Sequence, residues 1–220
     1  MTPHSRASLR VWVAAVAIAA ATGQPVSAQY GARTGADLPR LPWENDRVRV
    51  SLVTAEPGAA LPAGPNRVLV YLTADPAGVM PAEAVWQPSG ADGAVNRGPV
   101  RVEAIAIELK EDAPPSSARG TLPEALASMR LAEVSVLVDN PRVLVTKHRF
   151  RPYAWVTPLH FHPEDLLIVY LRGGYAWPAD GRWGAYRVRR GELDVVPANT
   201  FHTLANAGSD PIDFLVIAPR

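Results

Sequence analysis

Three of the chain's five histidines have a spacing that could hold a metal ion: His160, His162 and His202. In an extended chain, residues i and i+2 point to the same face about 7 Å apart, so the imidazoles of His160 and His162 can converge on one ion. A His-x-His pair is a weak signal by itself, because such pairs are common on exposed strands that bind nothing. The pair predicts a metal site only together with a third ligand, for which His202 is the candidate.

The segment around His202 has the residues of a strand, a turn and a return strand: Gly191 opens the first strand, Pro197 ends it and His202 begins the next. Together with His160-Phe161-His162, this segment resembles the cupin superfamily, whose motifs are G-x5-H-x-H-x3/4-E-x6-G and G-x5-P-x-G-x2-H-x3-N. The second motif is matched at Gly191, Pro197, His202 and Asn206, with Asn199 in place of its second glycine. Asparagine also tolerates a positive φ, so we expect this turn to be preserved.

The first motif is incomplete. Its closing glycine is present as Gly173 or Gly174, but both positions open to its glutamate, 166 and 167, are leucine. The resemblance therefore implies a three-histidine facial site for a divalent metal (Fe, Mn, Zn or Ni), with open coordination positions. Glu164 is a minor candidate ligand. The alternative is a relic site filled by packing or by direct contacts with a ligand.

Other side chains near the motifs are candidates for a pocket or for the surface. Tyr153, Trp155 and Tyr170 could line a pocket for a small ligand, although aromatic residues on strands more often belong to a core or its rim. His148 lies on a strand rich in lysine and arginine, which predicts a surface position.

The elements that would position these residues are short strands separated by turns rich in proline and glycine. Alternating or buried apolar runs predict strands at 47–53, 68–72, 100–109, 133–138, 142–150, 166–171, 187–189, 193–196 and 212–217. One short helix is expected after the capping-box sequence Thr121-Leu122-Pro123-Glu124. The predicted fold is all-β, a sandwich or barrel, and the resemblance implies the cupin double-stranded β-helix, a jelly-roll barrel.

A weak internal repeat suggests that this barrel is duplicated. Residues 44–50 resemble residues 139–145, and in each copy a later run ends in Val-Tyr-Leu, at 70–72 and 169–171. The first copy has no histidine, and residues 62–66 stand where its His-x-His would be. We expect a disordered arm at 29–42, a degenerate cupin-like half at 43–111, a linker with the short helix at 112–139, and a cupin domain with the metal motif at 140–220.

Residues 1–28 have the pattern of a secretory signal peptide. Arg6 and Arg10 precede the eleven-residue apolar run 11–21, and Val26-Ser27-Ala28 offers a cleavage site after Ala28. Eleven residues cover about half of a ~30 Å hydrocarbon core, which argues against an uncleaved anchor. Cleavage would leave 192 residues (220 minus 28) with 20 basic and 21 acidic side chains, a net charge of −1. This predicts a periplasmic or secreted protein with no remaining membrane span.

Composition excludes several classes of function. The near balance of charge gives no basic surface for nucleic acid, and the absence of cysteine excludes thiol nucleophiles and cysteine-ligated metals. Two hypotheses remain: a metal-dependent enzyme, such as a dioxygenase or a lyase or isomerase, acting on a small organic molecule, or a non-catalytic small-ligand-binding or structural cupin of the cell envelope. The resemblance also raises the expectation of a homodimer.

Overall fold

The computed structural model describes residues 40–73, 84–111, 132–154, 162, 165–178, 185–200 and 202–220. Every regular element in these ranges is a β-strand, which confirms the predicted all-β class; the expected helix after Thr121 lies outside them. The strands are β1 (Trp43–Glu44), β2 (Val48–Ala55), β3 (Arg67–Tyr71), β4 (Ala84–Gln87), β5 (Val102–Leu109), β6 (Ala132–Asn140), β7 (Val143–Phe150), β8 (Leu166–Tyr170), β9 (Gly174–Pro178), β10 (Tyr186–Val188), β11 (Leu193–Val196), β12 (Leu204–Asn206) and β13 (Ile212–Pro219). In the same ranges no helix is long and apolar enough to cross a membrane.

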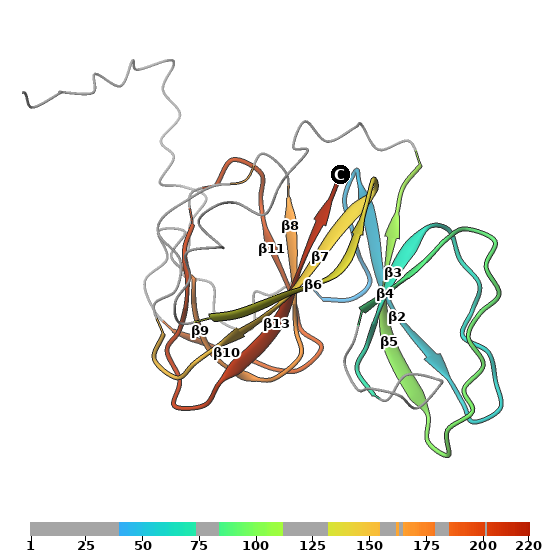
Figure 1. Ribbon diagram of the computed structural model, residues 1–220, viewed down its shortest axis with the longest axis horizontal. Coiled ribbons are helices and arrows are strands. Elements are labelled where there is room, and N and C mark those ends of the chain that lie inside the picture. The colour runs from blue at the N-terminus through green and yellow to red at the C-terminus, as the bar shows by residue number, and fades with distance from the viewer. Residues whose placement is uncertain are drawn as a thin grey trace, which may run out of the picture.

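The strands form two halves that lie side by side (Figure 1). The first half holds a five-stranded antiparallel sheet in the order β1-β2-β5-β3-β4. The second half holds a five-stranded sheet, β11-β8-β13-β7-β6, and a three-stranded sheet, β10-β9-β12. This pairing of two antiparallel sheets in the second half is the jelly-roll arrangement that the sequence predicts.

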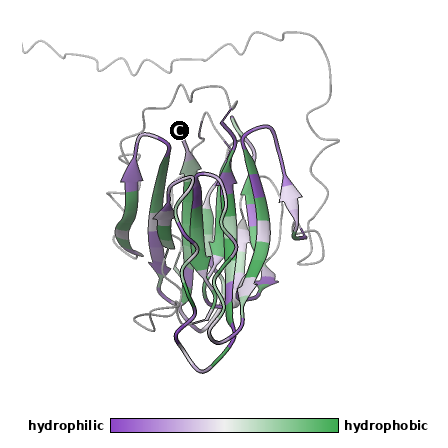
Figure 2. Cartoon of the chain, turned by 90° about the vertical axis from the view of Figure 1, so that its right-hand side faces the viewer, coloured by the Kyte–Doolittle hydropathy of each residue, from purple (hydrophilic) through white to green (hydrophobic). Residues whose placement is uncertain are grey.

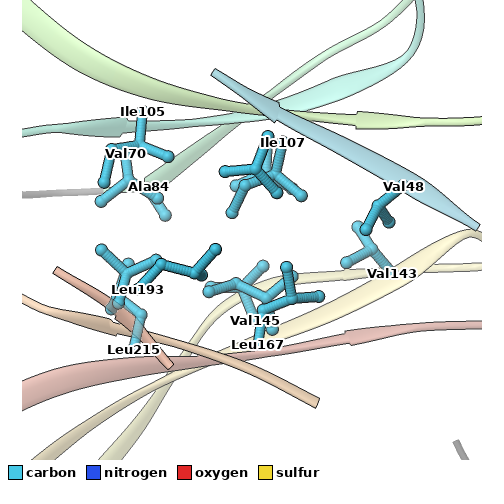
Figure 3. Close-up of a cluster of buried hydrophobic side chains, with 14 of the residues drawn as sticks. Val48, Val70, Ala84, Ile105, Ile107, Val143, Val145, Leu167, Leu193 and Leu215 are labelled. Carbon is cyan, nitrogen blue, oxygen red and sulfur yellow. The ribbon is translucent and has the colours of Figure 1, made fainter. Parts of the chain in front are cut away.

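A shared hydrophobic core joins the two five-stranded sheets. Figure 3 shows side chains of the first half, such as Ile107 and Val70, facing Val145, Leu167 and Leu215 of the second half. Most members of this interface core are completely buried. Burial of this much apolar surface is the main force holding the halves together.

Two further cores lie on the opposite faces of these sheets. One, which we call the barrel core, fills the second half and includes Ile168, Tyr170 and Phe214; the other, in the first half, includes Leu69 and Tyr71. Strands β3 and β8 therefore have core on both faces, and all five residues of each are buried. Core on both faces explains why β3 and β8 appear in the sequence as continuous apolar runs. Figure 2 shows that the hydrophobic residues are concentrated along the strands.

The two five-stranded sheets have the same strand order. If β1, β2, β5, β3 and β4 are set against β6, β7, β13, β8 and β11, the two sequences of neighbours coincide. The registers also agree: Val50 pairs with Ile107 and Ile107 with Val68 in the first sheet, as Val145 pairs with Ile217 and Ile217 with Leu167 in the second.

Turns outside the strands repeat as well. Asn45 Oδ1 accepts hydrogen bonds from the backbone N–H groups two and three residues later, and Asn140 Oδ1 does the same. Asn96 Oδ1 accepts from Gly98 N, and Asn206 Oδ1 accepts from Gly208 N. These matched contacts support the predicted duplication, which stays a prediction about the origin of the chain.

Candidate metal centre

The two histidines of the candidate site that the structure describes lie next to each other. The ring centroids of His162 and His202 are 5.1 Å apart and the rings are tilted by 33°. His162 comes shortly before β8, and His202 comes shortly before β12, with only 8% of its surface exposed. Residues 40 positions apart in the sequence are thus brought together, as the resemblance implied for this pair.

A tight turn after β11 places His202. Asn199 has a φ of 57°, which confirms that this position needs a residue tolerant of positive φ. Its backbone N–H donates to the carbonyl of His162 over 2.6 Å, so the turn is tied directly to the other histidine. The hydrogen bond therefore fixes the two histidine-bearing segments relative to each other.

The same turn fixes the tautomer of His202. His202 Nδ1 lies 3.0 Å from the carbonyl oxygen of Thr200, and because a carbonyl can only accept, Nδ1 carries the proton. The lone pair of the ring is then on Nε2. Metal-ligating histidines commonly donate their second ring nitrogen to a backbone carbonyl in this way, so the donor chemistry of His202 fits a metal ion.

Three of the predicted site residues, His160, Glu164 and Trp155, lie outside the described residues. Within the described ranges, no group of three or more histidine, cysteine or carboxylate side chains could hold a metal ion. The three-histidine site remains a prediction that depends on His160.

Side chains along β8 alternate between its two faces, and this shows whether Leu166 or Leu167 takes the place of the glutamate that the first motif lacks. Leu167 belongs to the interface core between the two halves, whereas Ile168 and Tyr170 belong to the barrel core. Since alternate residues of a strand share a face, Leu166 is the one on the barrel side. It is 6% exposed, so an apolar side chain fills this position.

Polar side chains inside the barrel form a chain of hydrogen bonds that the sequence did not reveal. Tyr170 and Tyr186 have hydroxyl oxygens 3.2 Å apart, and the Tyr186 hydroxyl donates to Asp194 Oδ2 over 2.7 Å. All three residues are buried. Burial raises the pKa of Tyr186 well above its usual value, and burial likewise raises the pKa of Tyr170, so both hydroxyls keep their protons. The sequence feature that could have indicated this network is Asp194, an acidic residue within the apolar strand 193–196.

The predicted surface position of His148 is wrong. Its side chain is 1% exposed, stacks on Phe214 with centroids 5.1 Å apart, and places Nε2 2.8 Å from Thr146 Oγ1. Burial lowers its pKa to about 4. Lys147 and Arg149 flank it in sequence but point to the other face of β7, because neighbouring residues of a strand face opposite sides.

The predicted pocket residues separate in the structure. Tyr170 is completely buried in the barrel core. Tyr153 is 68% exposed in the turn after β7, where its backbone N–H donates to Gly208 O. Of these two, only Tyr170 lies inside the barrel.

The first half has a different residue at the position that matches Leu166. The register places Arg67 there, one residue before Val68 as Leu166 is one residue before Leu167. Arg67 is 1% exposed; its Nε donates to Gln87 Oε1 over 2.8 Å, and its Nη2 donates to Pro62 O. A guanidinium therefore lies in the half that has no histidine.

Comparisons with known proteins agree with this fold. The family model of the cupin domain matches residues 147–218. No curated protein sequence matches the chain.

Solved structures with similar folds come from several bacteria. The AerE protein from Microcystis aeruginosa has a TM-score of 0.57 at 12% identity, over 79% of this chain and 88% of its own. A salicylate 1,2-dioxygenase from Pseudaminobacter salicylatoxidans has a TM-score of 0.53 at 10% identity, over 78% of this chain and 70% of its own. A cupin domain from Bordetella pertussis is 27% identical over 40% of this chain and 93% of its own, with a TM-score of 0.37.

At 10–12% identity the first two likenesses concern the fold alone. Residues 132–220 are only 89 of the 220 residues, so alignments over 78–79% of the chain also extend beyond the second half. The family match covers residues 147–218, and the jelly-roll fold of the second half agrees with that match, so this part of the chain resembles a cupin domain.

Proposed function

We propose that the second half binds a divalent transition metal through His160, His162 and His202 and uses it to transform a small organic molecule. The observation that carries the proposal is the His162–His202 pair, with ring centroids 5.1 Å apart and Nδ1 of His202 directed to the Thr200 carbonyl. Two imidazoles held in this way are suited to a shared ion such as Fe, Mn, Zn or Ni.

The ligands that this chain offers would make a bound metal more electrophilic. Three neutral imidazoles without the usual glutamate lower the negative charge of the ligand set, and Leu166 provides no replacement at that position. A metal with neutral ligands is more electrophilic and favours an anionic substrate. When bound, such a metal supplies Lewis-acid activation and open positions for a bidentate substrate and for O2 or water.

The barrel would supply the rest of the site. The apolar barrel core excludes water, while the chain from Tyr170 through Tyr186 to Asp194 adds fixed hydrogen-bonding groups to the interior. An oxygenase reaction or a lyase or isomerase reaction on a small organic anion is compatible with these groups. The fold shared with a salicylate 1,2-dioxygenase is in keeping with the first of these classes.

Metal content tests the proposal. Protein purified without a histidine tag should contain close to one divalent metal per chain, or bind one on reconstitution. His202→Ala should reduce that content strongly. His148→Gln is the matched control, because His148 is a histidine of the same domain that contacts Thr146 and aromatic rings. Wild-type protein that takes up no metal would contradict the proposal and favour the non-catalytic alternative.

We also propose that the chain is exported. The basic start, the apolar run 11–21 and the small residues at Val26-Ser27-Ala28 support this. After expression in a bacterium, intact-mass measurement of the periplasmic fraction should give a chain that begins at Gln29. A full-length chain confined to the cytoplasm would contradict it.

A further inference from the structure

We propose that Asp165 is a positioning residue through which the first half of the chain sets the geometry of the metal centre. This inference rests on the proposed function, because it assigns the first half a role in the site of the second half. It is argued from the hydrogen bonds of Asp165 and of the segments that it joins.

The two carboxylate oxygens of Asp165 serve different halves of the molecule. Oδ2 accepts a hydrogen bond from Asn45 Nδ2 over 2.7 Å, a contact between residues 120 positions apart. Oδ1 accepts from the backbone N–H of Ala198 over 2.8 Å. Asp165 is therefore a bridge between the turn before β2 and the turn after β11.

The turn held by Asp165 carries both histidine contacts described above. Ala198 is followed by Asn199, whose N–H donates to His162 O, and then by Thr200, whose carbonyl accepts from His202 Nδ1. A displacement of Ala198 would move both of these hydrogen bonds. Partners of this kind orient the imidazoles and tune their affinity for metal.

The other end of the bridge is fixed in the first half. Asn45 Oδ1 accepts from Arg47 N and Val48 N, each over 2.9 Å, so the side chain cannot rotate without breaking the turn. Val48 begins β2 and is completely buried in the interface core. The amide of Asn45 thus presents Nδ2 to Asp165 from a rigid base.

The equivalent residue of the first half shows what the carboxylate adds. By register Asn66 corresponds to Asp165, and its Oδ1 accepts from Ser89 N over 3.0 Å, as Asp165 Oδ1 accepts from Ala198 N. An asparagine therefore suffices to hold the turn. The second acceptor oxygen, which asparagine lacks, is the atom that binds Asn45.

A reciprocal exchange tests this assignment. In Asp165→Asn the new amide group opposes the amide of Asn45, and in Asn45→Asp two carboxylates face each other. In the double variant, the carboxylate introduced at position 45 accepts from the amide introduced at position 165. Both turn contacts keep their acceptor oxygens, so all the hydrogen bonds can form again. Asn140→Asp is the matched control, because Asn140 makes the same two turn bonds in the second half.

Two readouts are measured on the full chain: the exchange rate of the Asn199 amide by NMR, and the affinity for Co²⁺ with its absorption spectrum. Each single variant should speed exchange about tenfold or more and weaken Co²⁺ binding about tenfold, and the double variant should return both to within about threefold of the wild type. The control should change neither.

The outcomes separate the two proposals. If the wild type binds no Co²⁺, the proposed function fails, and the exchange data alone decide the role of Asp165. Unchanged exchange at Asn199 in both single variants overturns the inference, and so does a double variant that is no better than the singles. Thermal melting of each variant identifies any that does not fold. Asn45→Ala, which keeps the Asp165–Ala198 contact, then replaces the unfolded single variant in the comparison.

Discussion

At the scale of single residues, His148 makes the stability of the protein depend on pH. Its folded pKa is about 4, lowered by burial, against 6.5 for an exposed histidine. Between these values the unfolded chain binds a proton that the folded chain does not, so stability falls as the pH drops from about 6.5 to about 4. The expected loss is on the order of 3 kcal/mol.

His148→Gln should remove most of this dependence, since glutamine does not titrate and can still bond to Thr146. Urea unfolding of both proteins at about pH 7 and about pH 4.5 measures it. Equal losses of stability in the variant and the wild type would show that His148 is not the titrating group.

The buried tyrosines give a second residue-scale prediction. Tyr186→Phe removes the hydroxyl that donates to Asp194 Oδ2 and should destabilise the fold by about 1–3 kcal/mol, the usual cost when a buried acceptor loses a hydrogen bond. Tyr170→Phe is the comparison, because its hydroxyl lies 3.2 Å from that of Tyr186, a longer contact between two neutral groups. Urea unfolding should rank Tyr186→Phe as the more costly; the reverse order would mean that the network is held from Tyr170.

Misassignment of His148 shows where sequence patterns stop being informative. The strand signal of residues 142–150 predicts β7, but the lysine and arginine residues around His148 favour a surface position for it. Only the closing of the barrel over one face decides that His148 is inside. By contrast, Asn199 was assigned correctly, because the need for positive φ is local to one turn.

At the scale of elements, the turn between β11 and β12 should tolerate only residues that accept a positive φ. Asn199→Gly should leave stability unchanged or slightly raised, while Asn199→Ala should lose about 1 kcal/mol. Both variants keep the backbone N–H that donates to His162 O, so any difference between them reports the backbone conformation. Thermal unfolding measures it, and an alanine variant as stable as the glycine variant would contradict the strained geometry.

Pairing of the elements was only partly accessible from the sequence. Most strands of the second half were predicted, because turns rich in glycine and proline separate clear apolar runs. Their order was implied by the resemblance alone. The bridge from Asn45 to Asp165 spans 120 residues, and no local pattern encodes such a contact.

At the scale of the whole molecule, the interface core makes the two halves depend on each other. Ile107 of the first half faces Leu167 of the second across this core, and both are completely buried (Figure 3). Each replacement by alanine should cost about 2–5 kcal/mol, since a buried cavity is left behind. If the halves form one packed unit, the cavities merge in the double variant, and its cost should fall short of the sum by about 0.5–2 kcal/mol.

A matched cycle with Leu69 separates this coupling from a general loss of stability. Leu69 is equally an apolar residue of the first half, 1% exposed, but it belongs to the core on the other face of the sheet. Leu69→Ala and Leu167→Ala should therefore be additive in urea unfolding, while Ile107→Ala and Leu167→Ala should not. Additivity in both pairs would mean that the halves do not share a packed core. Asn45 would then have no fixed position from which the first half could act on the metal centre.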